Sequence, residues 1–236
     1  NTMVLGAAMF AFNEVCPNNW EIIHPHYRKL CKYLVDCEEW GQIAIISVLT
    51  RYCRTQFLSP FKESAFQKQQ FYSDDEESDD PLEQQGVSSD YDLAPDHRLI
   101  LTSAQPLLRT NNSAVVLSVA SLYFHVAPQL ECVKVVKPLL RLTRGPKETQ
   151  FIVLSNIATM AKERPTMFTD SLKEFYVFST DPHFIRVLKL EILSLLATET
   201  TVHQILKEFR SYLKFSEVEF VSATVRALGR VASEIS

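Results

Sequence analysis

The chain has 236 residues, of which 46% are apolar and 22% are charged. These proportions are those of a soluble globular protein and exclude a chain that is disordered throughout. The formal charge of −4 and the pI near 5.9 lack the positive field that binds phosphate backbones, which excludes nucleic acid as an expected partner.

The chain begins with an apolar run, TMVLGAAMFAF at residues 2–12, that predicts a core helix. It lacks a basic leader, and its eleven residues fall short of the roughly 20 that span a bilayer. Residues 25–36 and 40–53 then predict a helical hairpin, with a sequence resembling a capping box before Trp40. We expect Trp40 to pack between hairpins and not to bind a ligand. Since no Met initiates the chain and helical patterns reach both ends, we expect part of a longer protein.

Candidate reactive side chains are scattered. His24 and His26 lie near Cys31 but supply no closed set of four ligands, so we favour packing or capping over a metal site. The other histidines lack the spacing of a catalytic triad, and the glycines are too dispersed for a phosphate-binding loop. We therefore expect no enzyme, no metal and no cofactor. The odd number of cysteines without a C-x-x-C pair indicates reduced thiols: Cys16, Cys31, Cys37, Cys53 and Cys132.

Residues 56–94 interrupt the helical pattern with ten acidic and two basic residues, a net charge of −8 that leaves the remainder at +4. High charge with few apolar residues predicts a disordered insertion loop, between helical segments at 1–55 and 95–236. Ser73, Ser78 and Ser89 precede acidic residues, a context that suits an acid-directed kinase. The alternatives are a phosphorylated switch and a loop that only solubilises the chain.

The second half repeats. Four apolar stretches align when Val116, Phe151, Ile185 and Phe220 share one column, with spacings of 35, 34 and 35 residues. Each stretch continues with apolar or small residues at i+3 and i+7, which predicts a helix with one buried face. A second amphipathic stretch precedes each of the last three, and Pro138 predicts a kink inside its helix. Tandem hairpins predict an all-α, HEAT- or armadillo-like α-solenoid.

One amphipathic stretch carries a basic stripe. Lys134, Lys137, Arg141 and Arg144 follow the spacing i, i+3, i+7 and i+10, so they project from one side of a helix. The ordinary interpretation is a solvated face. The functional alternative is contact with an acidic partner, either a phospholipid headgroup or the acidic insertion of the same chain.

The repeat sequences themselves resemble a known family. The runs NNSAVVLSVASLY, ETQFIVLSNIATMAKERP, DPHFIRVLKLEILSLLA and VEFVSATVRALGRVA resemble the trunk of the beta subunits of heterotetrameric clathrin-adaptor complexes, as does EEWGQIAIISVLTRY. The resemblance covers most of residues 1–55 and 95–236. The acidic insertion and LCKYLVDCEEWGQ are most similar to the adaptor complex 3 branch of that family.

This resemblance implies a trunk that pairs with a delta-type large adaptin and holds medium (mu) and small (sigma) chains. It also implies recruitment by an Arf GTPase, cargo with tyrosine- or dileucine-based signals, and peripheral attachment to Golgi, endosomal and coated-vesicle membranes from the cytoplasm. Such an adaptor sorts cargo to lysosomes and related organelles. The alternatives are another helical-repeat scaffold, such as a coatomer beta trunk, a nuclear transport receptor or a phosphatase scaffold.

Overall fold

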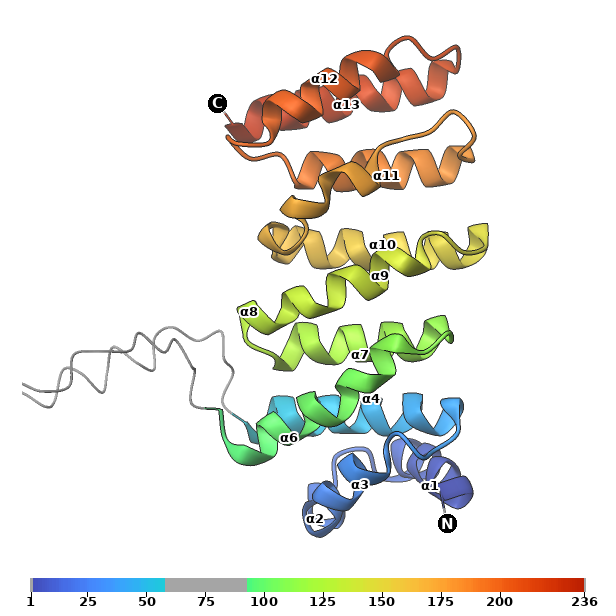
Figure 1. Cartoon of the computed structure of the whole chain (residues 1–236), viewed down its shortest axis with the longest axis vertical. Helices are drawn as coiled ribbons and strands as arrows, with labels where there is room; N and C mark the ends of the chain where they lie inside the picture. The colour runs from blue at the N-terminus through green and yellow to red at the C-terminus, as the bar shows by residue number, and fades with distance from the viewer. Residues whose placement is uncertain (1, 58–92, 236) are drawn as a thin grey trace, which may run out of the picture. The chain divides into compact units, whose positions relative to one another are not determined.

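The computed structural model describes residues 2–57 and 93–235, and every regular element in these ranges is helical (Figure 1). The fold is all-α, of the α-solenoid class, as the repeats predict. The expected acidic insertion at 56–94 falls almost entirely outside the described residues, as do Ser73, Ser78 and Ser89. The chain divides into two compact units, Asn1–Glu131 and Cys132–Ser236.

Unit 1 is built around α4 (Glu39–Gln56), whose Ile45 and Leu49 are completely buried. The side chain of Asn112 caps the helix that follows in the core by accepting a hydrogen bond from the backbone N–H of Ala114 at 3.0 Å. The other elements are α1 (Thr2–Val15), α2 (Trp20–Ile23), η1 (His24–His26), α3 (Tyr27–Tyr33), α6 (Pro95–Ala104), η2 (Gln105–Arg109) and α7 (Ser113–Val126).

The helices α1 and α4 cross closely at two glycines. A Cβ atom on Gly6 would lie 2.8 Å from the Cα of Gly41, closer than atoms of two packed residues approach. The absence of both side chains therefore sets the distance between these helices.

This crossing also explains why the expectation for Trp40 was wrong. Its side chain is 72% exposed and fills no core between hairpins. The buried face of α4 begins at Gly41, which faces α1, and continues through Gln42 and Ala44, whereas Trp40 lies in the first turn ahead of that face.

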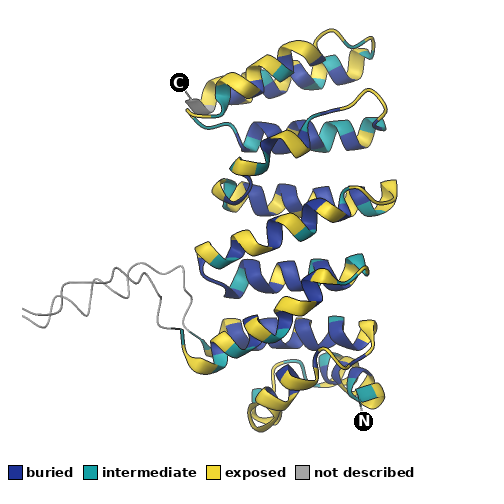
Figure 2. Cartoon of the chain, viewed as in Figure 1, coloured by how far each residue is buried: buried dark blue, intermediate teal, exposed yellow. Residues whose placement is uncertain are grey.

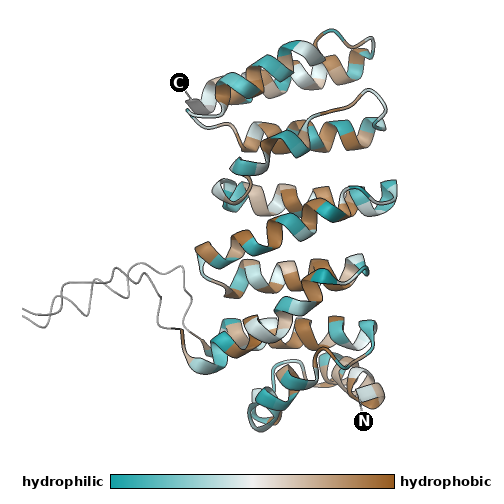
Figure 3. Ribbon diagram, viewed as in Figure 1, coloured by the Kyte–Doolittle hydropathy of each residue, from teal (hydrophilic) through white to brown (hydrophobic). Residues whose placement is uncertain are grey.

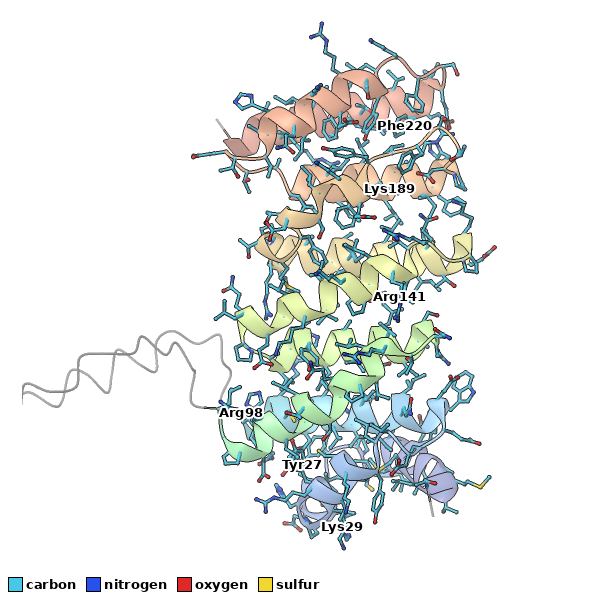
Figure 4. All side chains as sticks on the ribbon, viewed as in Figure 1. Tyr27, Lys29, Arg98, Arg141, Lys189 and Phe220 are labelled. Carbon is cyan, nitrogen blue, oxygen red and sulfur yellow. The ribbon has the colours of Figure 1, made fainter. Side chains whose placement is uncertain are left out.

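An aromatic cluster joins α3, the end of α4 and the start of α6. The rings of Tyr27 and Tyr52 stack at 5.0 Å, and those of Phe57 and His97 stack at 5.1 Å. The hydroxyl of Tyr27, labelled in Figure 4, donates to the backbone carbonyl of Asp96 at 2.8 Å. The helices on either side of residues 58–92 are thus fixed to the same cluster.

Unit 2 has two layers of helices, with α10, α11 and α13 in one and α9, η5 and α12 in the other (Figure 1). The buried residues lie between the layers, and the outward faces are mostly exposed (Figure 2). The element α8 (Gln129–Cys132) spans the division between the units. The others are η3 (Val133–Val135), α9 (Val136–Leu142), α10 (Lys147–Glu163), η4 (Pro165–Met167), η5 (Thr169–Phe175), α11 (His183–Leu195), α12 (Val202–Tyr212) and α13 (Val218–Ile235).

The repeat column holds at three of its four positions. Val116, Ile185 and Phe220 are completely buried, as the column predicts. Phe151 is 41% exposed, so that part of the prediction was wrong. Its ring instead contacts that of Phe184 on the surface, with centroids 5.6 Å apart, because the buried face of α10 is turned toward Val153 and Leu154.

Candidate functional site on the basic layer of unit 2

The predicted basic stripe lies on the outward side of its helical segment. Lys134 is in η3, Lys137 and Arg141 are in α9, and Arg144 follows that helix; all four side chains are exposed. Figure 4 labels Arg141 on this helix. The opposite side is buried, as the spacing predicts, through Cys132, Val136, Leu139 and Leu140. Pro138 lies in the first turn of α9, directly after the 3-10 element η3.

A second basic stripe, which the sequence reasoning missed, lies on α12 and the turn that follows it. Lys207, Arg210 and Lys214 are exposed and follow i, i+3 and i+7, the same spacing as in the first stripe. The other side of this helix is buried through Ile205, Phe209 and Tyr212. The hydrophilic colouring of the outward side is visible in Figure 3. The repeated charge spacing was the signal that could have revealed this stripe.

The segment η5 lies in the same layer and adds Lys173, which is also exposed. It is joined to the first stripe by an ion pair, since Arg144 lies 3.3 Å from Glu174. Both partners are largely exposed, so this pair contributes little to stability. We call the outward surface the basic layer and define it by eight residues: Lys134, Lys137, Arg141, Arg144, Lys173, Lys207, Arg210 and Lys214.

The two layers of unit 2 differ in charge. Residues 133–144, 165–175 and 202–214 hold eight basic and three acidic side chains, a net charge of +5. The opposite layer, at 147–163, 183–195 and 218–235, holds six basic and five acidic side chains, a net charge of +1. A chain that is negative overall therefore has a positive layer, which favours contact with an anionic surface.

One cation of unit 2 lies inside the fold. The ammonium group of Lys189 lies 2.7 Å from a carboxylate oxygen of Asp181, and both side chains are about 95% buried, at 5% and 6% exposure. Lys147 lies 3.5 Å from the other oxygen of Asp181. Burial would raise the pKa of Asp181, but the hydrogen bonds from Lys189 and from the backbone N–H of Phe178, with the charges of Lys189 and Lys147, hold it below its ordinary value. This pair holds α11 to the preceding loop and is unavailable to a partner.

A second polar group joins α11 to the segment before α13. Arg186 donates to a carboxylate oxygen of Glu217 at 2.5 Å, and the Nδ1 atom of His183 lies 2.6 Å from the other oxygen. The Arg186 guanidinium also lies 5.7 Å from the ring centroid of Phe220. His183, expected to be an ordinary core or surface residue, thus takes part in a structural contact.

His24, Cys31 and Cys53, among the other candidate residues, lie in unit 1. His24 forms a 2.7 Å hydrogen bond with the hydroxyl of Tyr52. Burial raises the pKa of Cys31 and of Cys53 to about 12, so both thiols remain protonated at neutral pH. Within residues 2–57 and 93–235 no three side chains of the metal-binding types are grouped as a metal site would require. In the same ranges no helix has the length and apolar character needed to cross a membrane.

A model of the adaptin N-terminal region matches residues 1–236. The chain belongs to the adaptin N-terminal family. It is 47% identical over 239 residues to AP-3 complex subunit beta-1 of Canis lupus familiaris, an alignment that covers 100% of this chain and 22% of the relative. It is 45% identical to AP-3 complex subunit beta-2 of Mus musculus, with 99% of this chain and 23% of the relative covered.

The structural comparison agrees with these adaptin relatives. The fold is similar, with a TM-score of 0.69 and 26% identity, to a chain in a homology model of the full-length AP-3 complex in an intermediate open conformation. That likeness covers 97% of this chain and 38% of the other. The resemblance to beta-adaptins drawn from the repeat sequences is confirmed. The chain spans about a fifth of the length of these curated relatives.

Proposed function

We propose that this chain forms part of the structural trunk of the beta subunit of a heterotetrameric vesicle-coat adaptor. Such an adaptor sorts membrane cargo from the Golgi and endosomes to lysosomes and related organelles. The observation that carries the proposal is the 44–47% identity to AP-3 beta subunits from mammals and Dictyostelium discoideum, which extends over both units. The chain has no proposed catalytic role, and the helical layers would present surfaces to other proteins and to the membrane.

The proposed partners are a delta-type large adaptin and the medium (mu) and small (sigma) chains. Through the assembled complex the chain would act with an Arf GTPase and with cargo sorting signals, at the cytoplasmic side of Golgi, endosomal and coated-vesicle membranes. The two layers of unit 2 differ enough in charge to bind different partners. The phosphorylation of Ser73, Ser78 and Ser89 remains a separate proposal, to be tested by mass spectrometry of the segment from cells.

Affinity purification of the tagged chain from cells tests the trunk function. We expect the delta-type adaptin, the medium chain and the small chain to co-purify, while a tagged helical-repeat protein of another family recovers none of them. Cross-linking through Lys162 of α10 and through Lys137 and Lys207 of the basic layer then shows which layer each partner contacts. Recovery of coatomer or phosphatase chains in place of adaptins would contradict the proposal.

A further inference from the structure

The basic layer contains cations that the fold itself does not use. Among the described residues no ion pair involves Lys137, Lys207, Arg210 or Lys214. The buried faces of their helices are apolar, so these four charges contribute nothing to the contact between the layers. Their long side chains remain free to reach an external anion.

Exposed apolar side chains stand next to lysines in this layer. Val133 is 49% exposed beside Lys134, and Leu213 is 38% exposed beside Lys214. Leu206, at 39% exposure, stands in the same way beside Lys207. A surface that mixes Lys or Arg with exposed aliphatic side chains is typical of elements that lie on a membrane, because the cations meet headgroups and the aliphatic groups enter the interface.

The distribution of charge favours a membrane over a single peptide. The cations are spread over η3, α9, η5, α12 and the turns after α9 and α12, and four of them, Lys137, Lys207, Arg210 and Lys214, are fixed by no ion pair among the described residues. Recognition of one acidic segment usually depends on positioned, bidentate donors. A headgroup layer requires only that many cations face one plane, since each Lys or Arg near an anionic membrane adds its own increment of binding.

We propose that the basic layer of unit 2 binds the anionic headgroups of a lipid membrane, with Val133, Leu206 and Leu213 entering the interface. The inference rests on the proposed adaptor function, which brings the chain to a membrane. It assigns the contact to α9, η5 and α12 and leaves the opposite layer of the unit to protein partners.

Vesicle co-sedimentation tests this proposal with the whole chain. The probe is a vesicle of phosphatidylcholine with phosphatidylserine, compared with one of phosphatidylcholine alone. The layer variant is K207E/R210E/K214E, and the matched control is K162E/R226E/R230E, which makes the same change in net charge on exposed residues of the opposite layer. Thermal unfolding followed by circular dichroism confirms that both variants are folded.

We expect the layer variant to bind the anionic vesicles at least about tenfold more weakly than the unsubstituted chain, and the control to remain within about twofold. Binding should also weaken in high salt, which shortens the screening length from about 8 Å to about 3 Å. Equal losses in the two variants would show an effect of net charge alone and would overturn the proposal. Unchanged binding of the layer variant would do the same.

A soluble probe separates a membrane from a protein partner. If a glutamate-rich peptide bound through the basic layer while anionic vesicles did not, the surface would be a protein-docking site and the lipid proposal would be wrong. The adaptor function is tested independently by co-purification of the other chains. If the chain co-purifies with adaptins but does not bind anionic vesicles, only this inference is contradicted. If it binds the vesicles but does not co-purify with adaptins, only the trunk function is contradicted.

Discussion

The inner and outer faces of the helices use the same residue types for different purposes. Lys189 lies between the layers in an ion pair with Asp181, whereas Lys207 lies on the basic layer with no ion pair among the described residues. Phe220 is completely buried, whereas Phe151 is 41% exposed. A side chain of unit 2 that is buried between the layers stabilises the fold, whereas the same residue type on an outward surface remains available to a partner.

Substitution of the buried phenylalanine should give the largest loss of stability. We expect Phe220→Ala to lower the free energy of unfolding by about 3–5 kcal/mol, because it leaves a cavity beside Tyr212 and Phe215. Phe151→Ala should cost about 1 kcal/mol or less, since that ring is partly in solvent. Urea denaturation of the two variants measures the difference in the free energy of unfolding. Similar losses would show that burial between the layers does not determine the cost of removing a ring.

Removal of the buried cation should have the next largest effect. Lys189→Met leaves the Asp181 carboxylate buried with the more distant Lys147 as its remaining cation, so we expect a loss of about 3 kcal/mol. Lys207→Met should change the free energy of unfolding by less than about 0.5 kcal/mol. The double variant D181N/K189M should recover part of the loss, since no unpaired charge then remains inside. A double variant less stable than Lys189→Met would contradict this explanation.

Substitution of a glycine in a helix crossing and of one in open space should give a smaller difference in stability. Gly6→Ala places a methyl group against the backbone of Gly41, and we expect a loss of about 1–3 kcal/mol as α1 and α4 move apart. Gly229→Ala meets nothing within 4 Å in α13 and should stabilise the helix by about 0.5–1 kcal/mol. Thermal melting of both variants tests the prediction, and equal shifts in Tm would count against a tight crossing at Gly6.

The smallest predicted effect depends on pH. Burial lowers the pKa of His97, whose neutral ring donates a 2.7 Å hydrogen bond to the carbonyl of Val126. As the pH falls, the unfolded state therefore binds a proton at His97 before the folded state does. The contribution of His97 to the free energy of unfolding should be complete above pH about 6.5 and should decrease as the pH falls toward the lowered pKa of the folded state. His97→Gln keeps a donor and should flatten the pH dependence measured by urea denaturation. An unchanged slope would assign the effect to another group.

Much of this arrangement could be predicted from the sequence, because the interval of 34–35 residues and the i, i+3, i+7 spacing determine which face of each helix is buried. The first basic stripe followed from the same periodicity, and the second could have been found in the same way at Lys207, Arg210 and Lys214. Other features could not. The buried face of α4 begins at Gly41, opposite Gly6, and leaves Trp40 exposed, while the burial of Lys189 depends on Asp181, which lies eight residues away. Periodicity alone contains no information on such pairwise contacts.

The most direct test of the account is whether cations on the basic layer serve membrane binding while the buried cation serves stability. One preparation each of the K207E/R210E/K214E variant and of Lys189→Met should be measured for both thermal unfolding and co-sedimentation with anionic vesicles. We predict that the triple variant keeps its Tm and loses vesicle binding, and that Lys189→Met has a lower Tm but binds vesicles normally at temperatures where it is folded. A triple variant that unfolds at a much lower temperature, or that binds vesicles as tightly as the unsubstituted chain, would contradict the account.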